Sequence, residues 1–109
     1  MDLSLRGKAV LVTGGSRGIG RQIALAFAEE GADVAICARD RERLAKTGSE
    51  LSAMGVRTRT LVADLFQEAD CRRVGVETAK AFGQLDVLVN NASTNVAGSL
   101  LTAGDDVLM

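Results

Sequence analysis

Glycine is concentrated in one short segment, where four of the seven residues from Gly14 to Gly20 are glycines. An apolar run precedes this segment and an amphipathic run follows it, which predicts a turn from a strand into a helix. Such a turn aims free backbone N–H groups at one point, and the helix dipole adds positive charge there. A pyrophosphate fits that point if side chains do not block it. We expect Gly14 to allow the tight turn, Gly18 to lie under the phosphates and Gly20 to allow close helix–strand packing.

Two other interpretations of the glycines remain open. Residues 15–20, "GSRGIG", match the start of a P-loop, but that motif continues with Lys and Ser/Thr, and this chain has Arg21 and Gln22. The segment could also be a merely flexible turn. Its position at the strand-to-helix turn where doubly wound folds bind ligands favours the phosphate interpretation.

The sequence offers few residues for other kinds of site, such as a metal centre or a disulfide. It has no histidine and two cysteines, Cys37 and Cys71, each within an apolar pattern. We therefore expect buried free thiols and neither a disulfide nor a metal site. A net charge of −1 gives no reason to expect nucleic acid or an anionic membrane as partner. No apolar run has spanning length and the N-terminus lacks a signal-peptide core, so we expect a cytoplasmic protein.

The elements that position the glycine segment alternate between strands and helices. The 109 residues suffice for one domain. Short apolar runs predict strands over residues 8–13, 33–38 and 85–90, and residues 57–63, with an alternating outer end, predict a further strand. Helical spacing predicts helices over residues 19–30, 40–54 and 70–82, with Asp70 opening the last one and Gly83 closing it.

This alternation predicts an α/β fold with parallel strands and right-handed crossovers. The expected strand order is 3-2-1-4, the first half of a Rossmann-like, doubly wound sheet. Its topological switch point lies between the first and fourth strands. There the glycine loop meets the end of the segment 88–91, "LVNN".

Three motifs together resemble the short-chain dehydrogenases/reductases. They are "TGGSRGIG" (13–20), "AD" (63–64) before Leu65, and "LVNNAS" (88–93), in that order and spacing. The resemblance runs from about Gly7 to at least residue 93 and is closest to the 3-oxoacyl-acyl-carrier-protein reductase type. It implies an NAD(P)-binding Rossmann domain over residues 1–109 of an oxidoreductase, without the catalytic half.

The resemblance also assigns cofactor-binding residues. Those around the pyrophosphate and the adenosine ribose are Gly14, Ser16, Arg17, Gly18, Ile19 and Gly20. Asp64 is expected to accept a hydrogen bond from the adenine amino group, and Leu65 to offer backbone contacts. The alternative for Asp64 is a helix cap. Asn90 is assigned to the nicotinamide-side ribose, and Ala92 of the same motif to the cofactor. Ser93 stands where the family usually has glycine.

Charge at the end of the second strand bears on the choice of cofactor. NAD-binding members of this family usually carry an acidic residue there, whereas this chain has Ala38 followed by Arg39. Arg39, with Arg17 near the same corner, could pair with a 2′-phosphate. Asp40 is a candidate ribose ligand for NAD, but we expect it at the start of the next helix. NADP is therefore expected over NAD.

A catalytic group is not found in this sequence. The family polarises a carbonyl with a Tyr whose pKa a nearby Lys lowers, and this pair lies beyond residue 109 in its members. The chain contains no tyrosine, and Lys80, Ser93 and Ser99 do not replace it. We expect the cofactor-binding part of an NADP-dependent carbonyl or 3-oxoacyl reductase, a homo-oligomer at full length. The alternatives are a nucleotide-binding module without chemistry and a non-functional remnant.

Overall fold

Strands and helices alternate along the chain, as the apolar pattern predicts. The computed structural model describes residues 5–14 and 18–91. Its elements are β1 (Ala9–Thr13), α1 (Gly18–Glu29), β2 (Asp33–Ala38), α2 (Arg41–Ser52), β3 (Thr58–Val62), α3 (Glu68–Phe82) and β4 (Val87–Asn90). Every predicted element is present, with ends that differ from the prediction by at most two residues.

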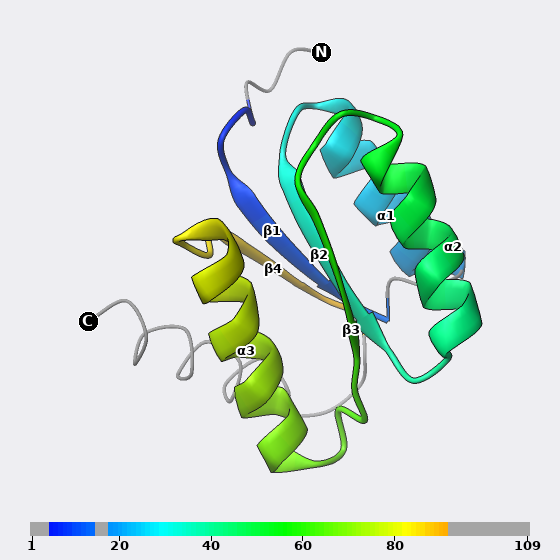
Figure 1. Cartoon of the computed structure of the whole chain (residues 1–109), viewed down its shortest axis with the longest axis vertical. Coiled ribbons are helices and arrows are strands. Elements are labelled where there is room, and N and C mark those ends of the chain that lie inside the picture. The colour runs from blue at the N-terminus through cyan, green and yellow to red at the C-terminus, as the bar shows by residue number, and fades with distance from the viewer. Residues whose placement is uncertain (1–4, 15–17, 92–109) are drawn as a thin grey trace.

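The four strands form one parallel sheet in the order β3-β2-β1-β4. The predicted strand order is therefore confirmed. In the central strand β1, Val10 aligns with Val34 of β2 and with Val87 of β4. Figure 1 shows α1 and α2 on one side of the sheet and α3 on the other. The sheet thus has the two-sided covering that right-handed crossovers from a central strand produce.

Two apolar cores lie on the two faces of this sheet. Alternate residues of β1 point to opposite faces, and all five are buried. One core joins residues of the sheet to α1 and α2: Val10, Val12, Ala24, Ala28, Ala32, Val34, Ile36, Leu44 and Leu51. The other joins the sheet to α3: Ala9, Leu11, Ala35, Cys37, Leu61, Ala63, Cys71, Val74 and Phe82. Burial of β1 and β2 on both faces explains why these two segments of the sequence are continuous apolar runs.

The beginning of α3 differs from the prediction. Asp70 was expected to open this helix, but the helix begins at Glu68 with Gln67 as its N-cap. Asp70 lies inside the first turn, and its carboxylate accepts a hydrogen bond from the N–H of Asp64 at 2.7 Å. The side chain therefore serves the preceding loop and does not cap its own helix.

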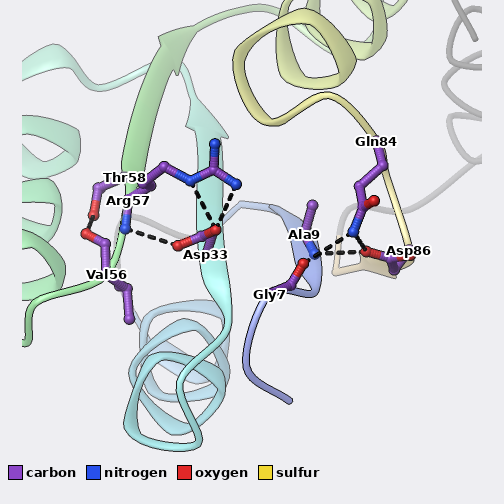
Figure 2. Close-up of polar contacts among 8 residues, drawn as sticks. All are labelled: Gly7, Ala9, Asp33, Val56, Arg57, Thr58, Gln84 and Asp86. Atoms are coloured by element: carbon purple, nitrogen blue, oxygen red, sulfur yellow. Dashed lines mark hydrogen bonds and ion pairs between the residues drawn. The ribbon is translucent and has the colours of Figure 1, made fainter.

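Carboxylates close the amino end of the sheet, opposite the glycine loop (Figure 2). Asp33 is 9% exposed and accepts from the backbone N–H and the Nε of Arg57, both at 2.9 Å. The Arg57 guanidinium also lies 5.3 Å from the centre of the Phe82 ring. At the neighbouring strands, Asp86 accepts from the N–H of Ala9 at 2.8 Å. Each carboxylate satisfies a backbone N–H at this end of the sheet.

The described part of the chain contains no helix with the length and apolar character that a membrane crossing needs.

Candidate functional site

Thr13 joins the ends of β1 and β4 at the switch point. This residue is fully buried, and its hydroxyl lies 3.2 Å from Oδ1 of Asn90 and 3.4 Å from the carbonyl of Val89. The hydroxyl also accepts from the N–H of Asn91 at 2.9 Å. The start of the glycine loop and the "NN" segment are therefore held together by one side chain. This contact places Asn90 beside the carboxyl end of the central strand.

The described glycines of the loop differ in what surrounds them, although Gly14 and Gly18 share a left-handed backbone. Gly14 has φ of 68° and donates its N–H to the carbonyl of Cys37 at 2.8 Å. Gly18 has φ of 61° and opens α1, and a Cβ built on it would meet nothing within 4 Å. At Gly20, a Cβ would lie 2.2 Å from the carbonyl oxygen of Gly14. Gly20 thus allows α1 to begin against the end of β1, while Gly18 leaves open space above the turn.

Polar groups at the end of β2 are divided between a helix cap and an exposed cation. Asp40 is the N-cap of α2, and its carboxylate accepts from the N–H of Arg43 at 3.1 Å. The same carboxylate lies 3.4 Å from Nε of Arg43. The prediction that Asp40 begins the next helix is confirmed. Arg39, immediately before it, is exposed.

The loop after β3 holds Asp64 in a tight turn. Asp64 Oδ1 accepts from the N–H of Phe66 at 3.0 Å, and its carbonyl accepts from the N–H of Gln67 at 2.9 Å. Since Gln67 is the N-cap of α3, the alternative that Asp64 caps this helix is wrong. Within residues 5–14 and 18–91, Asp64 Oδ2 and the N–H of Leu65 have no hydrogen-bond partner. An acceptor and a donor thus stand side by side in the chain at the carboxyl edge.

The remaining residues singled out in the sequence are either outside the described part of the chain or located as follows. Ser16, Arg17 and Ala92 lie outside the described residues, as do Ser93 and Ser99. Ile19, in the first turn of α1, is 70% exposed. Lys80 is in the last turn of α3, away from the carboxyl edge where that helix begins. The structure therefore gathers Gly14, Gly18, Ile19, Gly20, Arg39, Asp64, Leu65 and Asn90 on one edge of the sheet.

Two contacts of this edge were not predicted from the sequence. They are the Thr13 hydroxyl between β1 and β4 and the Asp70 carboxylate on the Asp64 N–H. A polar residue ending an otherwise apolar strand is a signal for the first. The second has only a weak signal, an acidic residue six positions after Asp64.

Neither cysteine has the character of a nucleophile. Cys37 and Cys71 are buried and free, as predicted. Burial raises the pKa of the Cys37 thiol to about 12. Burial, together with the nearby carboxylates of Asp70, Glu68 and Asp64, also raises the pKa of Cys71. Both thiols are neutral at physiological pH, whereas catalytic cysteines have lowered pKa values. Among the described residues, no group of His, Cys, Asp and Glu could hold a metal ion.

Sequence comparison gives one family match and several similar curated proteins. Residues 8–107 match the model of the short chain dehydrogenase family. A rhamnolipids biosynthesis 3-oxoacyl-[acyl-carrier-protein] reductase from Pseudomonas aeruginosa is 48% identical over 97 residues, which are 89% of this chain and 38% of that protein. An L-fucose dehydrogenase from Bos taurus is 46% identical over 84% of this chain and 33% of its own length. The chain thus spans less than half of these relatives.

Solved structures show the same fold with different cofactors. A short chain dehydrogenase from Burkholderia cenocepacia in complex with NADP is 35% identical, with a TM-score of 0.83 over 96% of this chain and 51% of that one. An L-sorbose reductase from Gluconobacter frateurii, complexed with NADPH and L-sorbose, has a TM-score of 0.81 at 32% identity over 98% of this chain and 47% of that one. An NAD+-bound xylitol dehydrogenase has a TM-score of 0.79 at 36% identity, over 83% of this chain and 35% of that one.

Proposed function

Since the chain belongs to the short-chain dehydrogenase family, we propose that it binds a nicotinamide dinucleotide along the carboxyl edge of its sheet, with NADP(H) preferred over NAD(H). The family is one of oxidoreductases, and its structural relatives include complexes with NADP, NADPH and NAD+.

The pyrophosphate belongs at the start of α1 in this proposal. The open space above Gly18 leaves room for a phosphate group, and the first turn of α1 carries no acidic residue. Free N–H groups and the helix dipole favour an anion there. Ser16, Arg17 and Ile19 are the further proposed contacts of this part of the cofactor.

The adenine belongs beside Asp64 and Leu65. Adenine presents an amino donor at N6 next to an acceptor at N1. The available Oδ2 of Asp64 and the N–H of Leu65 form the complementary acceptor and donor. At the other end of the cofactor, Asn90 and Ala92 are the proposed neighbours of the nicotinamide-side ribose. These assignments place the dinucleotide across the switch point, as doubly wound folds do.

The main support for a preference for NADP(H) is that Asp40 is the N-cap of α2. Its carboxylate is held by Arg43, so it does not stand free to bind two ribose hydroxyls. Arg39 is exposed at the same corner. A guanidinium pairs with a phosphate through two parallel hydrogen bonds, which suits the 2′-phosphate of NADP.

The reaction proposed for the whole protein is reduction of a carbonyl, of the 3-oxoacyl type, by hydride transfer. This sequence contains no tyrosine to act as the proton donor. We therefore propose that residues 1–109 supply the cofactor-binding part and perform no reduction by themselves. The absence of tyrosine also supports a second candidate function, that of a nucleotide-binding module that catalyses no reaction. Cytoplasmic location and homo-oligomerisation of the full-length enzyme complete the proposal.

Titration of the purified chain with NADPH and NADH tests the cofactor assignment. Arg39→Ala should weaken NADPH by about 1.5–3 kcal/mol, which is about ten- to a hundredfold, because a hydrogen-bonded charge pair is lost. NADH should bind almost as before. Arg41→Ala is the matched control, since Arg41 is an exposed arginine two residues away in the first turn of α2. Equal weakening of both cofactors, or a parent that prefers NADH, would contradict the assignment.

A further inference from the structure

Asp70 holds the loop that carries the proposed adenine contacts. We propose that Asp70 is a positioning residue for adenine recognition: it fixes the backbone of Asp64 so that the Asp64 carboxylate and the Leu65 N–H face the base together. This inference rests on the proposed function, because it assumes that adenine binds at this loop.

The first observation is the direction in which the Asp70 side chain bonds. Asp70 lies in the first turn of α3, where a carboxylate ordinarily interacts with free N–H groups of its own helix. Here Oδ2 accepts instead from the N–H of Asp64, six residues earlier, at 2.7 Å. The next helix residue also bonds back to the loop, but as a donor, since Sγ of Cys71 donates to the carbonyl of Leu65 at 3.2 Å. Two consecutive residues of α3 therefore hold two consecutive residues of the loop.

The second observation is that Asp70 is itself held by Arg73. Nη2 of Arg73 lies 3.7 Å from Oδ1 of Asp70 and donates to the carbonyl of Val62 at 2.7 Å. Nη1 of the same guanidinium pairs with Glu77 at 3.2 Å, one turn further along the helix. Val62 is the last residue of β3. The turn between the strand and Asp64 is thus anchored to α3 on both sides.

In this arrangement Asp70 positions the loop, and Asp64 is left to contact the ligand. The carboxylate of Asp70 is used by Asp64 and Arg73, whereas Oδ2 of Asp64 remains available for a ligand. A loop held in its binding conformation loses less entropy when the ligand arrives. Without Asp70, the N–H of Asp64 would bond to water and the loop would sample other conformations. The loss should fall on the adenine part of the cofactor and spare the other parts.

The test compares NADPH with reduced nicotinamide hypoxanthine dinucleotide phosphate. Hypoxanthine carries a carbonyl at C6 and a proton at N1, so it reverses the donor and acceptor that Asp64 and Leu65 recognise. The ratio of the two dissociation constants measures adenine recognition, and the parent chain should prefer NADPH by at least about tenfold. Asp70→Ala should weaken NADPH about tenfold and the hypoxanthine cofactor less than about threefold. Asp70→Asn, which keeps an acceptor for the Asp64 N–H, should retain most of the preference.

Glu68→Ala is the matched control, because it removes an acidic residue from the same turn of α3 without touching the loop. It should leave the ratio unchanged. If Asp70→Ala does not melt like the parent, Arg73→Gln replaces it, and the expected result is about a threefold loss of the ratio. A folded variant that keeps the parent ratio, or weakens both cofactors equally, overturns the inference. A parent that does not distinguish the bases overturns the adenine site itself, and one that binds neither overturns the proposed function.

Discussion

Cys37 lies directly under the glycine loop, where its carbonyl accepts the N–H of Gly14 and its thiol faces the core shared with α3. Water does not reach this thiol, because the side chain is fully buried. Burial raises the pKa of the thiol to about 12 by disfavouring the thiolate. A position so close to the proposed cofactor therefore carries a residue that packs and does not react.

We expect the native chain to show no thiol reaction with a disulfide reagent at pH 8, whereas the chain in urea should expose both cysteines. The unfolded thiol releases its proton near pH 8.5, and the folded one retains it to about pH 12. This group therefore contributes stability that is present below pH 8.5 and is lost as pH rises toward 12. Urea unfolding measured at pH 7, 9 and 10 should show a falling free energy. Cys37→Ser is the control for the unfolding experiment, because it removes the titrating thiol. In the labelling experiment, rapid reaction of the native parent would contradict the burial of the thiols.

At the scale of elements, α2 approaches β3 through a glycine. A Cβ on Gly48 would lie 2.5 Å from Cγ2 of Thr60, closer than two carbon atoms can pack. Gly48 is buried in the helix, and its backbone φ is not in the left-handed region. The glycine is therefore required by the close approach of the two elements.

Gly48→Ala should lower the free energy of unfolding by about 1 kcal/mol. Overpacking costs about 1–3 kcal/mol, and the better helix propensity of alanine returns about 0.5–1 kcal/mol of it. In a Thr60→Ser background the clashing methyl group is absent, so the same substitution should become neutral or stabilising. Urea unfolding of the parent, the two single variants and the double variant measures whether the effect of Gly48→Ala on the free energy of unfolding changes sign. Ser49→Ala, at the neighbouring exposed position, is the control, and an equal loss in both backgrounds would place the strain elsewhere.

At the scale of the whole molecule, β4 lies at one side of the sheet. It pairs with β1 on one side, and no other strand among the described residues pairs with it. Its apolar residues Val87, Leu88 and Val89 are only partly buried, in contrast to the fully buried β1. An apolar edge strand without proline offers unpaired backbone groups to another chain.

We therefore predict that the 109-residue chain self-associates through residues 85–90. Sedimentation at several concentrations should show a rising mean mass, and hydrogen exchange at β4 should slow as the concentration increases. The amides of β1 are the internal control, because that strand is paired on both sides and should be protected at every concentration. A monomer with protected β4 amides and one sharp melting transition would contradict the prediction.

Much of this architecture follows from the sequence because it depends on local patterns. Apolar runs buried on both faces specify parallel strands, and their alternation with helices limits the strand order to a doubly wound arrangement. Asp40, two residues after the second strand, was correctly assigned to the start of the next helix, because its carboxylate caps the N–H of Arg43 within the same short segment. The glycines of residues 14–20 indicated a strand-to-helix turn for the same reason.

Only the tertiary structure decided which polar groups are occupied and which remain available. The Thr13 hydroxyl reaches Asn90 across 77 residues, and the Asp86 carboxylate reaches the N–H of Ala9 across the same separation. Asp70, predicted to open α3, serves Asp64 instead because the helix begins earlier and turns this carboxylate toward the loop. A hydrogen bond depends on a few tenths of an ångström and on angle, and sequence spacing does not fix either across separate elements. Packing of strands and helices fixes both, and within the described residues it leaves Oδ2 of Asp64 and the N–H of Leu65 without a hydrogen-bond partner.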